Sequence, residues 1–295
     1  MKTKICIITL FIVLVLSCGH NNEKKNKLPE KKQPVTKTFE QKEKERLEKR
    51  AEIEKQEKID SLKLDKILFD ALKIATQEIN KKKFQKKYKV RPDNEYDVEV
   101  EINIDCYFAK NNPHLIIRRL EPNNVYIDIY SKDGNKFVKV LSHKEWAMTY
   151  MDDTIKDING DGLKDFVVNW YGATGCCLKA FSNIYLFRKD KKTFSKDFEF
   201  INPTFSPKEK IIRGVEYGHP GHTAIYKYKW NGEAVDTLEY VYYETDKEDR
   251  KTGKIIISKK EAYSKNKKDI RILNSIPVEY KNIEGFDWFT GKGYE

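Results

Sequence analysis

Strict alternation of apolar and polar side chains over residues 96–105 constrains the fold of this chain more than any other feature. The apolar members are Tyr96, Val98, Val100, Ile102 and Ile104, and charged or amide residues separate them. Because successive side chains of a β-strand point to opposite faces, this period of two predicts a strand with one buried and one solvated face. We therefore expect a β domain that occupies residues 93–295.

Three later segments repeat one layout, in which two short apolar runs flank a polar turn. They cover residues 125–141, 185–194 and 225–241, and the first and third have Asp-Gly and Asn-Gly at the turn. These dipeptides are strong signals for a β-hairpin. The copies are roughly forty to sixty residues apart, which is compatible with a β-propeller of about four or five small blades at most. A β-sandwich with several hairpins is the alternative.

An oxygen-rich loop precedes one of the predicted strands. Residues 157–166 read Asp-Ile-Asn-Gly-Asp-Gly-Leu-Lys-Asp-Phe, and the residues from there to Tyr171 read as a strand. Calcium takes about six to eight hard oxygen ligands, and alternate residues of a tight turn can converge on one ion. The expected ligands are the side chains of Asp157, Asn159, Asp161 and Asp165 and the backbone carbonyl of Leu163. The alternative is a turn that binds no metal, because Asn-Gly and Asp-Gly tolerate left-handed backbone angles.

The loop is not an EF-hand, since Val168 stands where that motif needs a bidentate glutamate. Its pattern Asp-x-Asn-x-Asp-Gly-x-x-Asp instead resembles the calcium loop of FG-GAP/VCBS-type repeats, which occur in β-propeller blades. Over residues 150–245, including the stretch 202–214, the chain is similar to bacterial envelope proteins of this kind. Some of these resemble immunity proteins that block lysozyme-type cell-wall hydrolases. The resemblance implies a mainly β, propeller-like domain with calcium in the loop, and it carries over no inhibitory residue.

The N-terminus predicts export. Lys2 and Lys4 precede an apolar run over residues 5–16, which is too short to span a bilayer and has the proportions of a secretory signal. The run ends in Val-Leu-Ser-Cys, which resembles a bacterial lipobox with Cys18 as the lipidated residue. An ordinary signal peptide, or a short buried helix, is the alternative. We expect a signal peptide over residues 1–17 and a lipid-anchored protein of the bacterial cell envelope, either periplasmic or outward-facing.

The segment after the expected anchor is strongly charged. Residues 18–60 predict a flexible tether followed by a solvated helical spacer, because Glu and Lys/Arg recur four residues apart. Residues 61–92 predict an amphipathic helix from apolar steps of three and four. The net charge of +11 is spread along a Lys-rich chain, and no nucleic-acid-binding signature accompanies it, so we expect no nucleic acid partner.

Three cysteines remain after the expected signal peptide and lipidated cysteine are set aside: Cys106, Cys176 and Cys177. This odd number allows one intrachain disulfide at most. In one alternative Cys106 pairs with Cys176 or Cys177, and in the other Cys176 and Cys177 form a rare vicinal bridge. With a disulfide and bound calcium, the adjacent loops would be held in one shape as a recognition rim. The candidate partner-binding residues of that rim are Tyr171, Arg213, Tyr217, His219 and His222.

These observations favour a binding module over an enzyme. We expect calcium to act structurally and the β domain to bind a macromolecule of the envelope, a protein in the first instance, with inhibition of a cell-wall hydrolase as the specific hypothesis. One alternative is a hydrolase with a Cys–His pair on the rim, and a zinc site built from the same residue types is a minor variant. Another alternative is a structural scaffold. The oligomeric state is left open.

Overall fold

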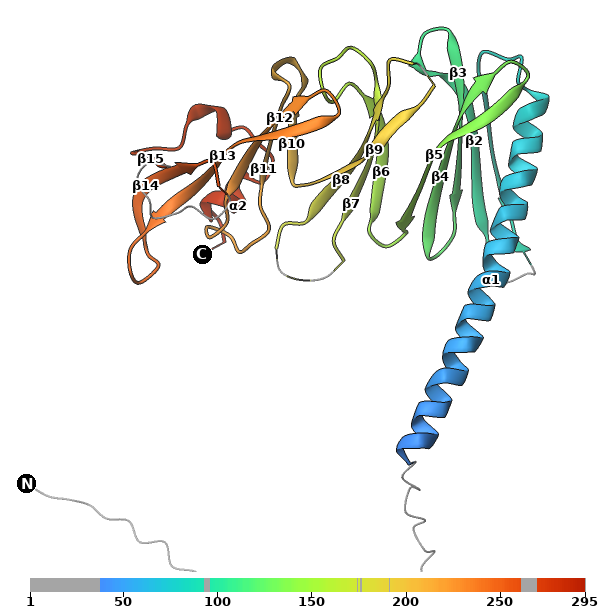
Figure 1. Ribbon diagram of the computed structural model, residues 1–295, viewed down its shortest axis with the longest axis horizontal. Helices are drawn as coiled ribbons and strands as arrows, with labels where there is room; N and C mark the ends of the chain where they lie inside the picture. Colours follow the sequence, from blue (N-terminus) through green and yellow to red (C-terminus); the bar gives the residue numbers. More distant parts are fainter. Residues whose placement is uncertain are drawn as a thin grey trace, which may run out of the picture. The chain divides into compact units, whose positions relative to one another are not determined.

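The computed structural model describes residues 38–92, 96–173, 175, 177–190, 192–260 and 270–294. Within these ranges the chain forms fifteen β-strands, which pair antiparallel in three sheets, and two α-helices (Figure 1). The protein is therefore mainly β, in agreement with the expectation from its alternating segments. The chain divides into two compact units, Met1–Lys55 and Gln56–Glu295.

The described part of the first unit is helical. Helix α1 (Phe39–Gln77) begins there and continues into the second unit. Up to Lys55 nearly every side chain is exposed, and neighbouring turns are joined by ion pairs such as Arg46–Glu43 at 2.6 Å and Arg50–Glu54 at 3.2 Å. Exposed pairs of this kind add only a few tenths of a kcal/mol each, about 0.3–0.5.

Each of the three sheets is a meander in which the strand order follows the chain order. The first sheet consists of β1 (Phe84–Val90), β2 (Val98–Ala109), β3 (Asn112–Leu120), β4 (Asn124–Asp133) and β5 (Lys136–Trp146). The second sheet consists of β6 (Tyr150–Lys156), β7 (Asp165–Tyr171), β8 (Ala180–Phe187) and β9 (Phe194–Ile201). The third sheet consists of β10 (Pro203–Ser206), β11 (Ile211–Val215), β12 (Ile225–Asn231), β13 (Ala234–Thr245), β14 (Lys251–Ser258) and β15 (Ile270–Leu273). Chain neighbours therefore pair throughout, which keeps the connections short.

The sheets of the second unit are stacked face to face, with an apolar core between each pair (Figure 1). The core between the first and second sheets includes Ile116, Ile127 and Ile129 from one and Phe166 and Phe187 from the other. The core between the second and third sheets includes Val167, Ile184 and Leu186 from one and Ile212, Tyr226 and Trp230 from the other. Neighbouring residues of one strand, such as Phe166 and Val167, point into different cores. The second sheet therefore has no solvent-facing side along its centre.

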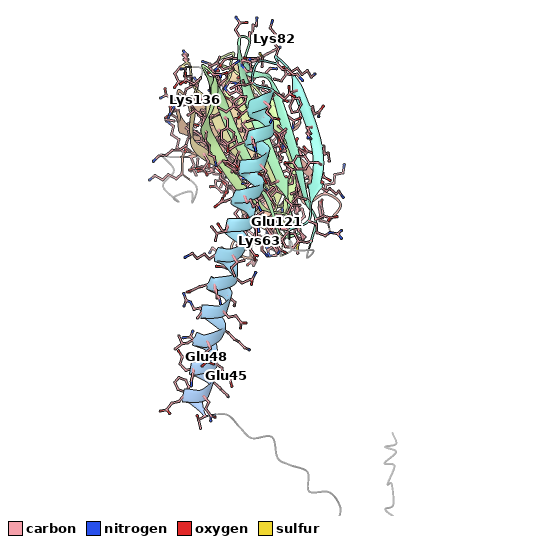
Figure 2. The ribbon with its side chains drawn as sticks, turned by 90° about the vertical axis from the view of Figure 1, so that its right-hand side faces the viewer. Glu45, Glu48, Lys63, Lys82, Glu121 and Lys136 are labelled. Carbon is pink, nitrogen blue, oxygen red and sulfur yellow. The ribbon has the colours of Figure 1, made fainter. Side chains whose placement is uncertain are left out.

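The outer faces of the first and third sheets are also covered. The second half of α1 packs Leu64, Ile67 and Ala71 against the first sheet, and it lies along that sheet from Lys63 to the end of the helix (Figure 2). The last turns of the chain, with α2 (Phe286–Thr290), pack Tyr280, Ile283, Trp288 and Phe289 against the third sheet. Among the described residues the three sheets form a capped stack and no closed ring, and their number lies within the predicted upper limit of four or five blades.

The expected helix over residues 61–92 differs from the structure at its end. Helix α1 stops at Gln77, and residues 84–90 form β1, which pairs with β2. The apolar residues Phe84, Tyr88 and Val90 follow a period of two, whereas those before them follow steps of three and four. This change of period marks the boundary between helix and strand.

Candidate functional site

The loop expected to bind calcium connects β6 to β7 in the second sheet. The backbone N–H groups of Gly160 and Gly162 donate to the two carboxylate oxygens of Asp157, at 2.7 and 3.0 Å. The N–H of Asp161 donates to Oδ1 of Asn159 at 3.0 Å, and that of Leu163 donates to Oδ1 of Asp161 at 2.9 Å. The side chains at positions one, three and five thus hold the loop as a tight coil.

Asp165 closes the loop from the first position of β7 and is fully buried. Its Oδ2 accepts the N–H of Ile158 and its Oδ1 accepts the N–H of Phe187, both at 2.9 Å. Burial raises the pKa of Asp165 to about 7. The negative charges of Asp161 and Asp157 also raise this pKa, whereas the two amide hydrogen bonds lower it. A cation in the loop would relieve this concentration of negative charge.

Two glycines with positive φ shape the coil. Gly160 and Gly162 have φ angles of +72° and +84°. A Cβ on Gly160 would lie 2.0 Å from the carbonyl oxygen of Pro207, whereas a Cβ on Gly162 would meet nothing within 4 Å. The loop is therefore seated against the 3₁₀ turn Pro207–Glu209, which lies between β10 and β11.

The donor set of the loop suits calcium in kind. All five expected ligand atoms are oxygens, and each carboxylate oxygen that accepts one amide hydrogen keeps a further lone pair for a metal. Over the described part of the chain, no three His, Cys, Asp or Glu side chains converge closely enough to hold a metal ion. The expected calcium ligands also include the amide oxygen of Asn159 and the carbonyl oxygen of Leu163, which are not residues of that kind. The calcium site stays a prediction.

A cavity of about 470 Å³ lies beside the loop. Asn159 and Asp161 line it on the loop side, and the end of β8, the turn after it, Lys210 and the β12–β13 turn complete the wall. The sequence analysis did not anticipate this cavity. Its walls come from the second and third sheets, and only the pairing of strands within each sheet brings these turns to the same end of the stack.

The rim residues lie at the other end of β7. Asp165 begins this seven-residue strand and Tyr171 ends it, so the loop and the rim are about 20 Å apart at 3.3 Å per residue. This differs from the expectation that calcium would hold an adjacent rim. The separation follows from the length of the strand that joins the two loops.

The structure places the five rim candidates in two different environments. Tyr171 and Tyr217 are 41% and 59% exposed, and His219 and His222 are also exposed. Arg213 is only 6% exposed, and its guanidinium donates to Glu209 and Glu279, each at 2.7 Å. This paired and buried guanidinium suits a structural contact between the third sheet and the C-terminal segment.

Further exposed side chains at this end were missed by the sequence analysis. Trp146, Met148 and Met151 lie around the β5–β6 turn and are 45%, 72% and 59% exposed. The N–H of Tyr171 donates to the carbonyl of Thr149 in that turn at 2.8 Å, which joins the turn to the rim. No turn was predicted between residues 146 and 150, and pairing of β6 with β7 was needed to place these side chains.

Two of the three candidate disulfide cysteines lie among the described residues, and both disulfide alternatives stay predictions. Cys106 lies on β2 and is a free thiol among the described residues, while Cys177 is buried in the core of the third sheet. Cys176 and residues 1–37, which include Cys18 and the expected signal peptide, lie outside the described residues. The vicinal bridge and the lipidation therefore stay predictions.

The hydrolase alternative requires a cavity that joins a cysteine to a histidine. Four cavities of about 440–530 Å³ are lined by described residues, and none of these four has a cysteine or a histidine in its wall. Cys177 is 6% exposed and faces the apolar core, while His219 and His222 face solvent. Geometry of this kind offers the hydrolase alternative no support, and the question of enzymatic activity stays open to experiment.

Comparison with known proteins adds no relative. No protein-family model matches the chain, and no curated protein and no solved structure does so either. No helix within the described ranges is long and apolar enough to cross a membrane.

Proposed function

We propose that this chain is a lipid-anchored protein of the bacterial envelope whose calcium-stabilised β domain binds a macromolecule and inhibits a cell-wall hydrolase. The observation that carries the proposal is the coil from Asp157 to Asp165. Asn159 and Asp165 are buried in it, and its side-chain oxygens are fixed by backbone amides. A turn that only reverses the chain needs no buried carboxylate at its end.

The arrangement of the sheets supports a propeller-like interpretation of the domain. Three consecutive antiparallel meanders are stacked face to face, and consecutive propeller blades pack in this way. The loop precedes β7, as the resemblance to FG-GAP/VCBS-type repeats implies. Calcium would act here by joining the β6–β7 connection to the third sheet through the contact of Gly160 with Pro207.

The macromolecular partner would bind at the end of the stack that carries Tyr171. Tyrosine, tryptophan and methionine are enriched in protein interfaces, and tyrosine and tryptophan supply contact area at low entropic cost. The large exposed side chains gathered at this end are Trp146, Met148, Met151, Tyr171, Tyr217 and Tyr294. Tyr294 also packs its ring against Trp288 at 4.8 Å, so the surface has a rigid support.

The calcium site is tested by thermal unfolding of the full chain with about 1 mM calcium, a level that suits extracellular sites, and with excess chelator. Ligands that bind only the folded state raise the midpoint. We expect a midpoint several degrees higher with calcium, and no such difference in Asp161→Ala. Asp236→Ala, an exposed carboxylate on β13, is the matched control and should respond as the wild type does. Identical curves with and without calcium would reject the site.

The partner is tested by adding the purified chain to a lysozyme-type hydrolase that digests cell walls. Inhibition that weakens in the double variant Tyr171→Ala, Tyr217→Ala supports the proposal. Val138→Ala, an exposed apolar residue of β5, should leave inhibition unchanged. Absence of inhibition at a large excess of the chain would reject the hydrolase as the partner while leaving the calcium result intact.

A further inference from the structure

The cavity beside the calcium loop has the size and lining of a small-molecule site. Its volume of about 470 Å³ lies within the range of roughly 300–1,000 Å³ that such sites occupy. Its floor is apolar, because Leu186, Phe187 and Trp230 line it and are each no more than 3% exposed. Exposed charged residues form its edge.

Each carboxylate that lines this cavity already accepts at least one hydrogen bond from the protein. Arg188 donates to both carboxylate oxygens of Glu233, at 2.6 and 2.8 Å. The backbone N–H groups of Lys192 and Thr193 donate to Asp190 at 2.8 and 3.0 Å. Asp161 accepts the N–H of Leu163 within the loop.

Apart from Arg188, several donors of the same cavity have no protein acceptor among the described residues. The indole N–H of Trp230 is buried with no acceptor among the described residues. Asn159 is 8% exposed, and its Oδ1 accepts the N–H of Asp161. Its amide nitrogen has no acceptor in the described ranges. The ammonium groups of Lys189 and Lys210 have no carboxylate within 4.0 Å among those residues. A buried donor without an acceptor is rare in folded proteins, so the indole N–H of Trp230 needs an explanation.

Lys210 is held in place by the backbone on both sides. It adopts a left-handed conformation with φ of 59°, which is uncommon for a residue with a side chain. Its N–H donates to the carbonyl of Pro207 at 3.0 Å, and its own carbonyl accepts the N–H of Trp230 at 2.9 Å. The strained conformation fixes the lysine beside the indole, and such strain is concentrated at functional sites.

We propose that this cavity binds a small organic oxyanion, a phosphate monoester or a carboxylate, through Lys189, Lys210 and the Trp230 indole N–H. The oxyanion supplies the acceptors that these three donor groups lack. The apolar part of the ligand lies on Leu186 and the ring of Trp230, which belong to the core between the second and third sheets. This site differs from the macromolecule-binding end of the stack and does not require calcium, so it goes beyond the proposed function.

Titration calorimetry on the full chain tests the site. The protein is first freed of divalent cations on a chelating resin, because a soluble chelator carries carboxylates that would compete. The probes are phenyl phosphate, benzoate, inorganic phosphate and benzyl alcohol. We expect at least one of the two organic oxyanions to bind more tightly than inorganic phosphate, and benzyl alcohol to show no binding.

The double variant Lys189→Gln, Lys210→Gln should bind the organic oxyanion at least about tenfold more weakly, because two charge-assisted hydrogen bonds are removed. Both positions are exposed, so the variant keeps the fold. Lys164→Gln is the matched control, since Lys164 is an exposed lysine of the calcium loop outside the cavity wall, and it should bind as the wild type does.

Three results would overturn the inference: no binding of either organic oxyanion, equal affinity for inorganic phosphate, or unchanged affinity in the double variant. The outcome is separable from that of the calcium site. Asp157→Ala, which changes an expected calcium ligand outside the cavity wall, should still bind the probe when freed of metal, whereas only the unfolding experiment with added calcium reports on the metal.

Discussion

Gly160 and Gly162 have similar left-handed backbone angles in one loop, but their surroundings differ. An alanine at either position is disfavoured by roughly 1–2 kcal/mol for the left-handed conformation alone. At Gly160 the new Cβ would also lie 2.0 Å from the carbonyl oxygen of Pro207. We expect Gly160→Ala to lower the free energy of unfolding by clearly more than Gly162→Ala does, as measured by urea denaturation. Equal losses would show that the loop moves away from Pro207 without cost.

His114 is fully buried between aromatic rings. Its Nδ1–H donates to the carbonyl of Asn112 at 2.9 Å, and its Nε2 has no partner among the described residues. The rings of Phe108 and Phe187 lie 5.1 and 5.3 Å away, centroid to centroid. Burial lowers the pKa of His114 to about 4, so the imidazole is neutral in the folded protein over most of the acid range.

This pKa predicts how stability depends on pH. Between the unfolded pKa near 6.5 and about 4, the unfolded chain binds more protons at His114, so stability falls as pH falls through that window. The full loss from this group is about 3 kcal/mol. His114→Asn keeps a donor for the Asn112 carbonyl and should flatten the pH dependence of the free energy of unfolding. His222→Asn, at an exposed position, should leave it unchanged, and a His114→Asn curve parallel to the wild type would contradict the prediction.

At the scale of the element, α1 acts as the cover of the first sheet. Ala71 and Ala75 are fully buried on its sheet-facing side, so small side chains set how closely the helix approaches β2 and β3. Ala71→Leu should overpack this contact and destabilise the protein by about 1–3 kcal/mol in thermal or urea unfolding. Lys66→Leu introduces the same side chain on the exposed face of the helix and should change stability by no more than about 0.5 kcal/mol. Similar losses in both variants would show that the second half of α1 does not pack as described.

The elements were largely predictable where one local pattern decided the outcome. The alternation over residues 98–104 became the buried core of β2, and Gly134 and Gly232, at the Asp-Gly and Asn-Gly turns, have the positive φ that tight hairpins need. The predicted helix was too long because the charged residues after its apolar part, up to Lys83, are compatible with either a helix or a loop. Local patterns also could not show that Phe166 and Val167 face different cores, which depends on the stacking of sheets.

The candidate sites show the same division. Asp157, Asn159, Asp161 and Asp165 lie in one loop, so the sequence alone was enough to group them. The cavity beside them draws Lys189, Lys210 and Trp230 from separate turns, and no spacing rule relates those residues. Arg213 was grouped with the exposed rim because it precedes the turn at residues 218–222 by only a few positions, but it lies within β11 and its carboxylate partner Glu279 lies far along the chain.

On the scale of the second unit, the stack needs a cover on each outer sheet. Val215, Ile225, Val241, Ile255 and Ile257 form the outer apolar face of the third sheet, and the last turns of the chain bury it. Trp288 also donates its indole N–H to the carbonyl of Gly218 at 2.9 Å, and the carbonyl of Trp288 accepts the N–H of Gly221 at 2.8 Å. The C-terminal segment thus has the role of a capping repeat in a linear array, where an open end would expose apolar surface.

Removal of this cover should therefore be more harmful than its length suggests. A chain truncated after Leu273 loses Tyr280, Ile283, Trp288 and Phe289 from the core, and large-to-small changes at one buried aromatic position alone are worth about 3–5 kcal/mol. We expect the truncated chain to bind a hydrophobic dye and to self-associate in size-exclusion chromatography. A chain truncated after Gly291 loses only exposed described residues. Its dye binding and its elution volume should be those of the wild type. If the chain truncated after Leu273 bound no dye and eluted at an unchanged size, the third sheet would not depend on its cover. The account of the fold as a capped stack would then fail.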